Sequence, residues 1–149
     1  IEQTIPYRVS SIVDAYGVLM VGDSLSSNIG ILDKSAFSEY GEEVRRRFIT
    51  PQLDNEGQPF WIDSLELWGD AGLGLTSGQG SEAEVLMSFS KDGGRTFSNT
   101  LTRSMGEKGD YTKRTIWNSL GRASRELCFK FEVSDPVNWV FSKVEAEIE

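Results

Sequence analysis

The sequence predicts an all-β protein whose larger part is an antiparallel β-sandwich. Apolar and polar residues alternate with a period of two in several segments, most clearly at residues 125–134 (RELCFKFEVS), as expected for half-buried strands. Turn signals rich in Gly, Asp and Pro recur about every ten residues, a spacing typical of sandwiches and barrels. No segment has the periodicity of a long helix.

Two segments of different character are expected. Residues 1–50 contain short strands at 1–9 and 28–33 and, between them, the apolar segment 11–22, and we interpret them as the end of a preceding β-domain in a longer protein. Because residues 18–21 (VLMV) are all apolar and lie between Gly17 and Gly22, this run is expected to be a strand that is buried on both faces. Residues 42–50 alternate as a strand, which Pro51 ends. Residues 51–149 are expected to form the sandwich.

Six strands are expected in the sandwich, at residues 60–69, 84–90, 96–105, 110–118, 125–134 and 137–149. Leu65 and Leu67 are expected to face the core from the first of them. The inward residues of the fifth strand are expected to be Leu127, Phe129, Phe131 and Val133. Turns are expected between the strands, at 106–109, 119–122 and 135–136. Alternating glutamates on the outer face of the last strand would discourage edge-to-edge pairing.

The best-defined motif is a turn with the spacing Ser90-x-Asp92-x-Gly94-x-Thr96-Phe97. This spacing matches the Asp-box, a hairpin motif of sialidases and other all-β proteins. Adjacent glycines supply the positive backbone angles of a tight turn, and the aspartate can accept backbone N–H bonds within it. The motif therefore predicts a structural turn, with no chemistry of its own.

The composition excludes several classes of function. A net charge of −8 argues against a groove binder of nucleic acid, although a channel wall along which DNA slides stays open. The absence of histidine removes most transition-metal sites and the usual general base. A single cysteine, Cys128, allows no internal disulfide. We therefore expect no catalytic residues, no cofactor, no metal site and no membrane segment.

Three groups of residues are candidates for contacts with other proteins: the basic run Arg45, Arg46 and Arg47, the aromatics Phe37 and Tyr40, and the glycines Gly74, Gly78 and Gly80. Aromatic and arginine side chains are common interface anchors. The glycine-rich segment at 70–81 is not expected to bind phosphate, since neither Gly-Lys-Ser/Thr nor a helix follows it. A backbone lying flat against a neighbouring subunit would also explain these glycines.

Two other functions stay open at this point. A carbohydrate-binding module could use tryptophans as stacking platforms, namely Trp61, Trp68, Trp117 and Trp139. A coplanar pair on one open face would favour that function. A glycosidase of sialidase type could use a carboxylate pair such as Asp63 and Glu66, but one Asp-box without an arginine triad argues against it.

Six phrases in order resemble one family: residues 60–67 (FWIDSLEL), 72–80 (GLGLTSGQG), 85–97 (VLMSFSKDGGRTF), 109–114 (GDYTKR), 117–122 (WNSLGR) and 131–136 (FEVSDP). The ordered set is similar to the C-terminal part of the packaged-DNA stabilisation proteins of short-tailed bacteriophages, which are tail hub or nozzle components. The resemblance covers roughly residues 39–136. Phe97 stands where the family often has tryptophan, and the residues before 39 carry little resemblance.

The resemblance implies a structural subunit of a ring, sixfold in the family, below the portal and its adaptor ring. Such hubs retain the packaged genome and carry the tail needle or fibres, without catalysis. It also implies that the protein is made in the bacterial host cytoplasm and ends in the virion tail, with DNA at most passing through the channel. The ring is expected of the full-length protein, whereas this piece alone is expected to be monomeric.

Overall fold

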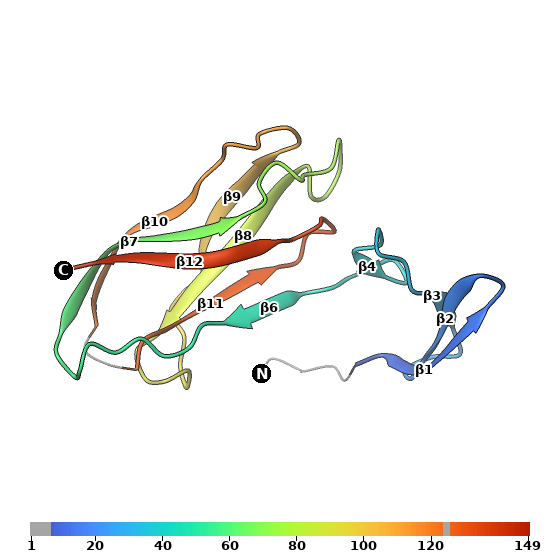
Figure 1. Cartoon of the computed structure of the whole chain (residues 1–149), viewed down its shortest axis with the longest axis horizontal. Coiled ribbons are helices and arrows are strands. Elements are labelled where there is room, and N and C mark those ends of the chain that lie inside the picture. Colours follow the sequence, from blue (N-terminus) through green and yellow to red (C-terminus); the bar gives the residue numbers. More distant parts are fainter. Residues whose placement is uncertain (1–6, 124–125) are drawn as a thin grey trace. The chain divides into compact units, whose positions relative to one another are not determined.

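A computed structural model describes residues 7–123 and 126–149, and these residues contain strands but no helix (Figure 1). Contacts divide the chain into two compact units, residues 1–42 and 43–149. The second unit includes β6 (Arg46–Ile49), because this strand pairs with β11 (Cys128–Val133). The sequence analysis placed the β6 residues in the first segment. Of the strand expected at 1–9, residues 1–6 lie outside the described residues.

The first unit contains a three-stranded antiparallel sheet in the order β1 (Val9–Ala15), β2 (Val18–Asp23) and β3 (Ile29–Ile31). A second hairpin, β4 (Ser38–Glu39) with β5 (Glu42–Glu43), follows. The strand expected in the segment 11–22, over residues 18–21, lies within β2, and the earlier residues of this segment belong to β1. Tyr16 and Gly17 have φ angles of 57° and 77°, so they form a tight turn that folds the segment into the β1–β2 hairpin.

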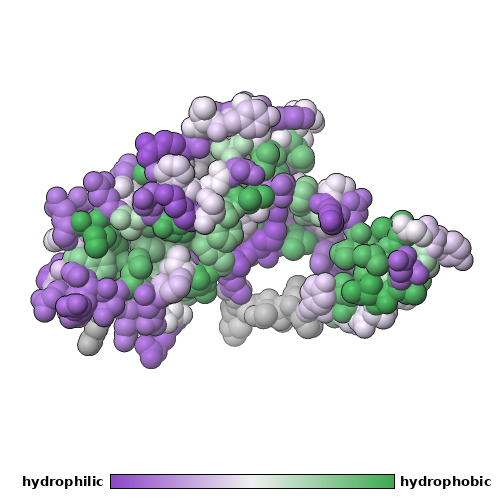
Figure 2. Space-filling view, in the orientation of Figure 1, coloured by the Kyte–Doolittle hydropathy of each residue, from purple (hydrophilic) through white to green (hydrophobic). Residues whose placement is uncertain are grey.

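The described part of the first unit exposes most of its apolar side chains. The expected burial of residues 18–21 on both faces is therefore wrong. Val18 and Leu19 are 37% and 43% exposed, whereas Val21 is 7% exposed. Other exposed apolar residues of the sheet are Ile12, Val13, Ile29 and Ile31. Figure 2 shows the resulting hydrophobic surface over this hairpin. The described residues of this unit form no second layer that would cover the faces of the small sheet.

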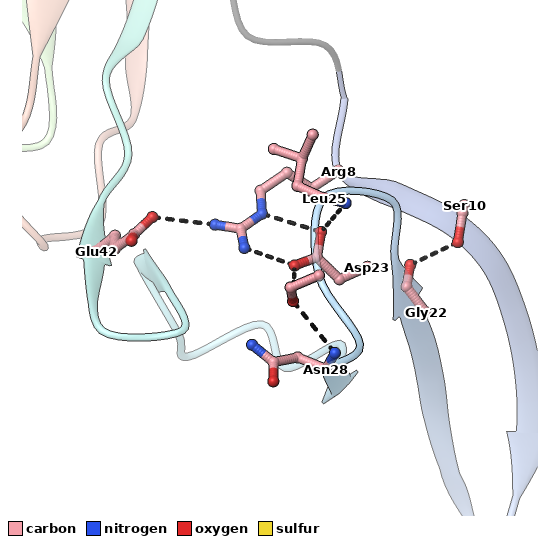
Figure 3. Close-up of polar contacts among 8 residues, drawn as sticks. Arg8, Ser10, Gly22, Asp23, Leu25, Asn28 and Glu42 are labelled. Atoms are coloured by element: carbon pink, nitrogen blue, oxygen red, sulfur yellow. Dashed lines mark hydrogen bonds and ion pairs between the residues drawn. The ribbon is translucent and has the colours of Figure 1, made fainter.

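An ion pair at the end of β2 holds the first unit together (Figure 3). Arg8 donates two hydrogen bonds to the buried carboxylate of Asp23, from Nε at 3.2 Å and from Nη2 at 2.6 Å. Ser26 Oγ and the Leu25 amide also donate to Asp23, at 2.6 and 3.0 Å. These bonds hold the pKa of Asp23 well below its usual value, with the bond from Arg8 as the largest cause. The remaining Arg8 nitrogen donates to Glu42 at 3.1 Å.

The second unit is a β-sandwich of two antiparallel sheets (Figure 1). One sheet has the order β10 (Thr115–Ala123), β7 (Phe60–Gly69), β12 (Phe141–Ile148). The other has the order β6, β11, β8 (Glu82–Ser90), β9 (Leu101–Glu107). The predicted all-β fold with an antiparallel sandwich is confirmed.

The core lies between the two sheets. Leu65 and Leu67 face it from β7, as predicted, with 0% and 7% exposure. Trp117 and Met87 contribute large buried side chains from β10 and β8. The predicted inward residues of β11 and of the bridge before it are all buried: Leu127, Phe129, Phe131 and Val133. Because both sheets contribute to one cluster, the two layers form a single core.

The two long sides of the sandwich differ. On one side β9 contacts β10, and Trp117 Nε1 donates to the Leu101 carbonyl at 3.0 Å while Arg103 Nε donates to the Ile116 carbonyl at 2.9 Å. On the other side no Cα atoms of β6 and β12 approach within 8 Å of each other. Side chains alone join these two strands, with the rings of Phe48 and Phe141 stacked at 4.0 Å. We call the second side the open side.

Several boundaries in the sandwich differ from the predictions. β10 begins at Thr115 and β12 at Phe141, later than the expected 110 and 137. The turn expected at 119–122 is wrong, because β10 continues through it as a bulge between Asn118 and Gly121. Ser119 and Gly121 take φ angles of 58° and 84° there. The return strand expected to begin at Thr96 begins instead at Leu101, the first residue of β9.

Candidate functional site

The turn after β8 is built around the carboxylate of Asp92. Ser90 Oγ donates to Asp92 Oδ1 at 2.6 Å and Thr96 Oγ1 donates to Oδ2 at 2.6 Å. The amides of Arg95 and Thr96 donate to Oδ1 at 3.0 and 2.9 Å, and the Gly94 amide donates to Ser90 Oγ at 2.8 Å. These bonds, led by the one from Ser90, hold the pKa of Asp92 well below its usual value. All of them close the turn on itself.

This turn also covers the start of β11. The Gly93 amide donates to the Glu126 carbonyl at 3.0 Å, and a Cβ added at Gly94 would lie 3.8 Å from Cys128 Sγ. The Lys130 ammonium lies 4.6 Å from the centre of the Phe97 ring. Cys128 is consequently buried, at 2% exposure. The geometry gives the residues from 90 to 97 a structural role in the fold.

The three arginines at the start of the sandwich do not form one patch. Arg46 points inward and donates from Nη1 to the Val137 carbonyl at 2.6 Å and from Nη2 to the Asp135 carbonyl. Burial lowers the pKa of Arg46. Arg45 and Arg47 alternate with it and are exposed, as the period of a strand requires. Two arginines are thus accessible to a partner, while the third joins β6 to the loop before β12.

The glycine-rich segment lies against its own chain. A Cβ at Gly72 would come within 2.8 Å of the Asp110 backbone, and one at Gly74 within 2.5 Å of the Ser81 carbonyl oxygen. A Cβ at Gly80 would meet Val137 at 3.0 Å, whereas Gly78 has open space around it. Close packing against the sandwich therefore explains these glycines, and only the tip around Gly78 faces outward.

Of the two aromatics singled out in the first unit, Tyr40 has contacts within that unit. Phe37 is half-buried, and Tyr40 is 43% exposed. The Arg8 guanidinium lies 4.8 Å from the centre of the Tyr40 ring. A Cβ at Gly30 would lie 2.7 Å from the Tyr40 hydroxyl oxygen, so the ring fits closely over β3. The contacts of Tyr40 therefore indicate a structural role within this unit.

The four tryptophans fall into two groups. Trp117 is fully buried, and Trp139 packs against Phe48 with ring centroids 5.6 Å apart. Trp61 and Trp68 are 54% and 42% exposed on the outer face of β7. Seven positions of an extended strand place them roughly 20 Å apart, which is too far for one stacking platform. The structure thus offers no coplanar pair among these four residues.

The acidic residues of this outer face are partly paired. Glu66 accepts two hydrogen bonds from Arg114, at 2.8 Å from Nε and 2.6 Å from Nη2. This bidentate pair lowers the pKa of Glu66, so the carboxyl group is held in its charged form. The pairing of Arg114 with Glu66 was not predicted, because residues 48 positions apart give no local signal in the sequence. Within the described residues, no group of three or more acidic or cysteine side chains could hold a metal ion.

The outer face of the β10–β7–β12 sheet is the strongest candidate for an interface in the sandwich. Lys143 lies over Trp68, with Nζ 4.5 Å from the ring centre, and pairs with Glu145 at 3.1 Å. Ser64 Oγ donates to Glu147 at 3.2 Å. These contacts fix the side chains around the exposed rings, which lowers the entropic cost of binding a partner there.

Among the described residues, no helix is long and apolar enough to span a membrane.

Comparison with models of known protein families gives a match. Residues 45–149 match the family model described as the β-sandwich of bacteriophage P22 Gp10. The match covers more than two thirds of the chain and includes every strand from β6 to β12. No curated protein gives a significant match to the chain.

Proposed function

The chain belongs to the bacteriophage P22 Gp10 β-sandwich family, and from this membership we propose that it is a structural subunit of a phage tail hub or nozzle ring. In this role it helps to retain packaged DNA and to attach the tail needle or fibres. The full-length protein forms the ring, with an adaptor ring above it and needle or fibre proteins below. Its place is the virion tail, after synthesis in the cytoplasm of the bacterial host.

The observation that carries the proposal is the family match over the entire sandwich. Two structural features support it. The polar clusters at Asp92 and at Glu66 are closed by bonds within the chain, as in a protein that acts through its shape. The net charge of −8 suits a wall past which DNA moves without adhering.

A closed ring requires two different surfaces on each subunit, because its contacts are heterologous. We place one of them on the outer face of the β10–β7–β12 sheet, where Trp61 and Trp68 are exposed and Lys143 lies over the Trp68 ring. Large aromatic side chains are frequent anchors of such contacts. Arg45 and Arg47, exposed at β6 in the other sheet, belong to the second surface.

The mass of the full-length protein in solution, measured by light scattering, tests the ring. We expect a single large assembly and expect Trp61→Glu with Trp68→Glu to reduce it to smaller species. Tyr111→Glu is the matched control, since Tyr111 is 71% exposed and lies outside this face. A full-length monomer, or equal effects of both variants, would contradict the proposed ring surface.

DNA retention is tested in phage particles. Heads filled in the absence of the protein should release their DNA to added nuclease, and heads completed with the natural protein should protect it. The double tryptophan variant should protect DNA less than the Tyr111→Glu control does. Full protection of DNA in particles without the protein would contradict a role in retention and leave a role in attachment of fibres.

A further inference from the structure

A cavity opens between the two sheets on the open side of the sandwich. Its volume is about 590 Å³. The main apolar residues around it are Phe48, Phe60, Leu65, Phe129, Val144 and Ala146. At its mouth Ile49, Phe141 and Ile148 are 49%, 42% and 53% exposed. Apolar side chains thus surround a space that the described residues leave unfilled.

The strand beside this cavity has a free edge. β12 pairs with β7 along its length, and no other described strand pairs with its second edge. Half of its backbone N–H and C=O groups therefore point away from the sheet. β6, on the other side of the cavity, pairs over only four residues and is followed closely by Pro51, which has no N–H to donate. β12 is the longer and less interrupted edge.

We infer that the free edge of β12 accepts an extended segment of another polypeptide in which apolar and basic residues alternate. The segment would add a strand to the β10–β7–β12 sheet, and its apolar side chains would fill the cavity. Strand addition at a sheet edge combines main-chain hydrogen bonds with pockets for alternate side chains. This acceptor edge requires only the sandwich, so it holds whether or not the proposed ring forms.

The alternation of β12 defines the apolar side of the partner. Val144 and Ala146 are half-buried and line the cavity, so the inner face of β12 continues directly into it. A strand placed beside β12 directs every second side chain to this same face. Those side chains would cover the apolar mouth and close the sandwich where β6 and β12 do not meet.

The charges of β12 define the other side. Glu145 and Glu147 point to the outer face, and Glu149 follows with the same parity. Basic residues opposite them would be stabilised by cross-strand pairing, whereas like charges directly opposite are destabilising. The β12 strand of a second copy would bring its own glutamates to this row, which disfavours it as the occupant. Charge complementarity therefore favours a basic segment from a different polypeptide.

Binding of labelled synthetic peptides, followed by fluorescence anisotropy on the whole chain, tests the inference. The probe alternates valine and lysine, and its controls are a valine–glutamate peptide and a scrambled peptide of the same composition as the probe. The valine–lysine peptide should bind at least about tenfold more tightly than either control, since several favourable cross-strand pairs contribute together. Equal binding of all three would overturn the inference.

Two variants separate the two parts of the site. Ala146→Phe places a ring in the cavity mouth and should weaken the valine–lysine peptide by about tenfold or more. Glu145→Lys with Glu147→Lys lies on the outer face, away from the core, and should transfer the preference to the valine–glutamate peptide. Preference that stays with lysine in this second variant would overturn the proposed edge. The inference would also be overturned if the natural chain associates with itself and the Ala146→Phe variant does not. A second copy of the chain would then be the occupant of the edge.

Discussion

The guanidinium of Arg46 donates from Nη1 to the carbonyl oxygen of Val137 at 2.6 Å, across 91 positions of the chain. A second bond from the same side chain reaches the Asp135 carbonyl. Together they fasten β6, the first strand of the sandwich, to the loop that leads into β12, the last strand. This contact ties the two elements that flank the open side.

Replacing Arg46 should therefore destabilise the sandwich. Arg46→Gln should lower the free energy of unfolding by about 1–3 kcal/mol, because two part-buried carbonyl groups lose a charged donor. Urea denaturation measures this change. Lys108→Gln, at an exposed position of the turn after β9, should change it by less than about 0.5 kcal/mol. Similar losses from both variants would show that the inward contact of Arg46 has no special weight.

Phe131 lies in the core between Phe48 and Trp117. Its removal should destabilise the sandwich more than the loss of the Arg46 side chain. Its ring stacks on Phe48 at 4.9 Å and lies 5.7 Å from Trp117, with no exposed surface. Phe131→Ala should reduce the free energy of unfolding by about 3–5 kcal/mol through lost burial and a new cavity. Trp61→Ala removes an exposed ring from β7 and should cost less than about 1 kcal/mol. Thermal unfolding of the two variants, side by side, makes the comparison.

The sequence predicted most of the sandwich because alternation gives direct information on burial. Leu65 and Leu67 on β7, like Phe129 and Phe131 on β11, face the core as expected. Alternation is less informative for the residues of β11 between these inward positions. Cys128 and Glu132 are buried as well, at 2% and 9% exposure. When other segments pack on both faces of a strand, its two faces no longer differ in burial. Cys128 is buried by the turn at 90–97, which is distant in the sequence.

Residues with positive φ have two different outcomes in this chain. Gly121 and its neighbours were expected to end a strand, but they form a bulge inside β10. Tyr16 and Gly17, just before the run expected as a strand, form a turn. A glycine signals an unusual backbone angle, and only the pairing partners decide between a bulge and a turn. Contacts such as Arg46 with Val137 depend on topology, which local patterns do not encode.

Acid should weaken the turn around Asp92. The pKa of this carboxyl lies well below its usual value of 3.8, with the hydrogen bond from Ser90 as the largest cause. Its contribution to stability is therefore fully present above the pKa of the unfolded state and is lost as the pH falls through the folded-state pKa. Asp92→Asn should lower the melting temperature at neutral pH, and the gap to the natural protein should narrow towards a pH of about 3.

The control for this prediction removes the same charge elsewhere. Asp63→Asn lies at an exposed position of β7 and should leave the melting temperature at neutral pH nearly unchanged. A gap between Asp92→Asn and the natural protein that stays constant with pH would contradict a role for the carboxylate charge. It would then point to the shape of the turn alone.

The glycine-rich segment offers a matched pair of substitutions within one loop. Gly72 and Gly78 have φ angles of 71° and 80°, so alanine at either position adopts a strained left-handed conformation that costs about 1–2 kcal/mol. At Gly72 the added methyl group would also come within 2.8 Å of the Asp110 backbone, whereas at Gly78 it meets nothing within 4 Å. Gly72→Ala should therefore destabilise the sandwich clearly more than Gly78→Ala in urea denaturation. Equal losses would show that the loop can move off the sandwich, and would restore a neighbouring subunit as the reason for its glycines.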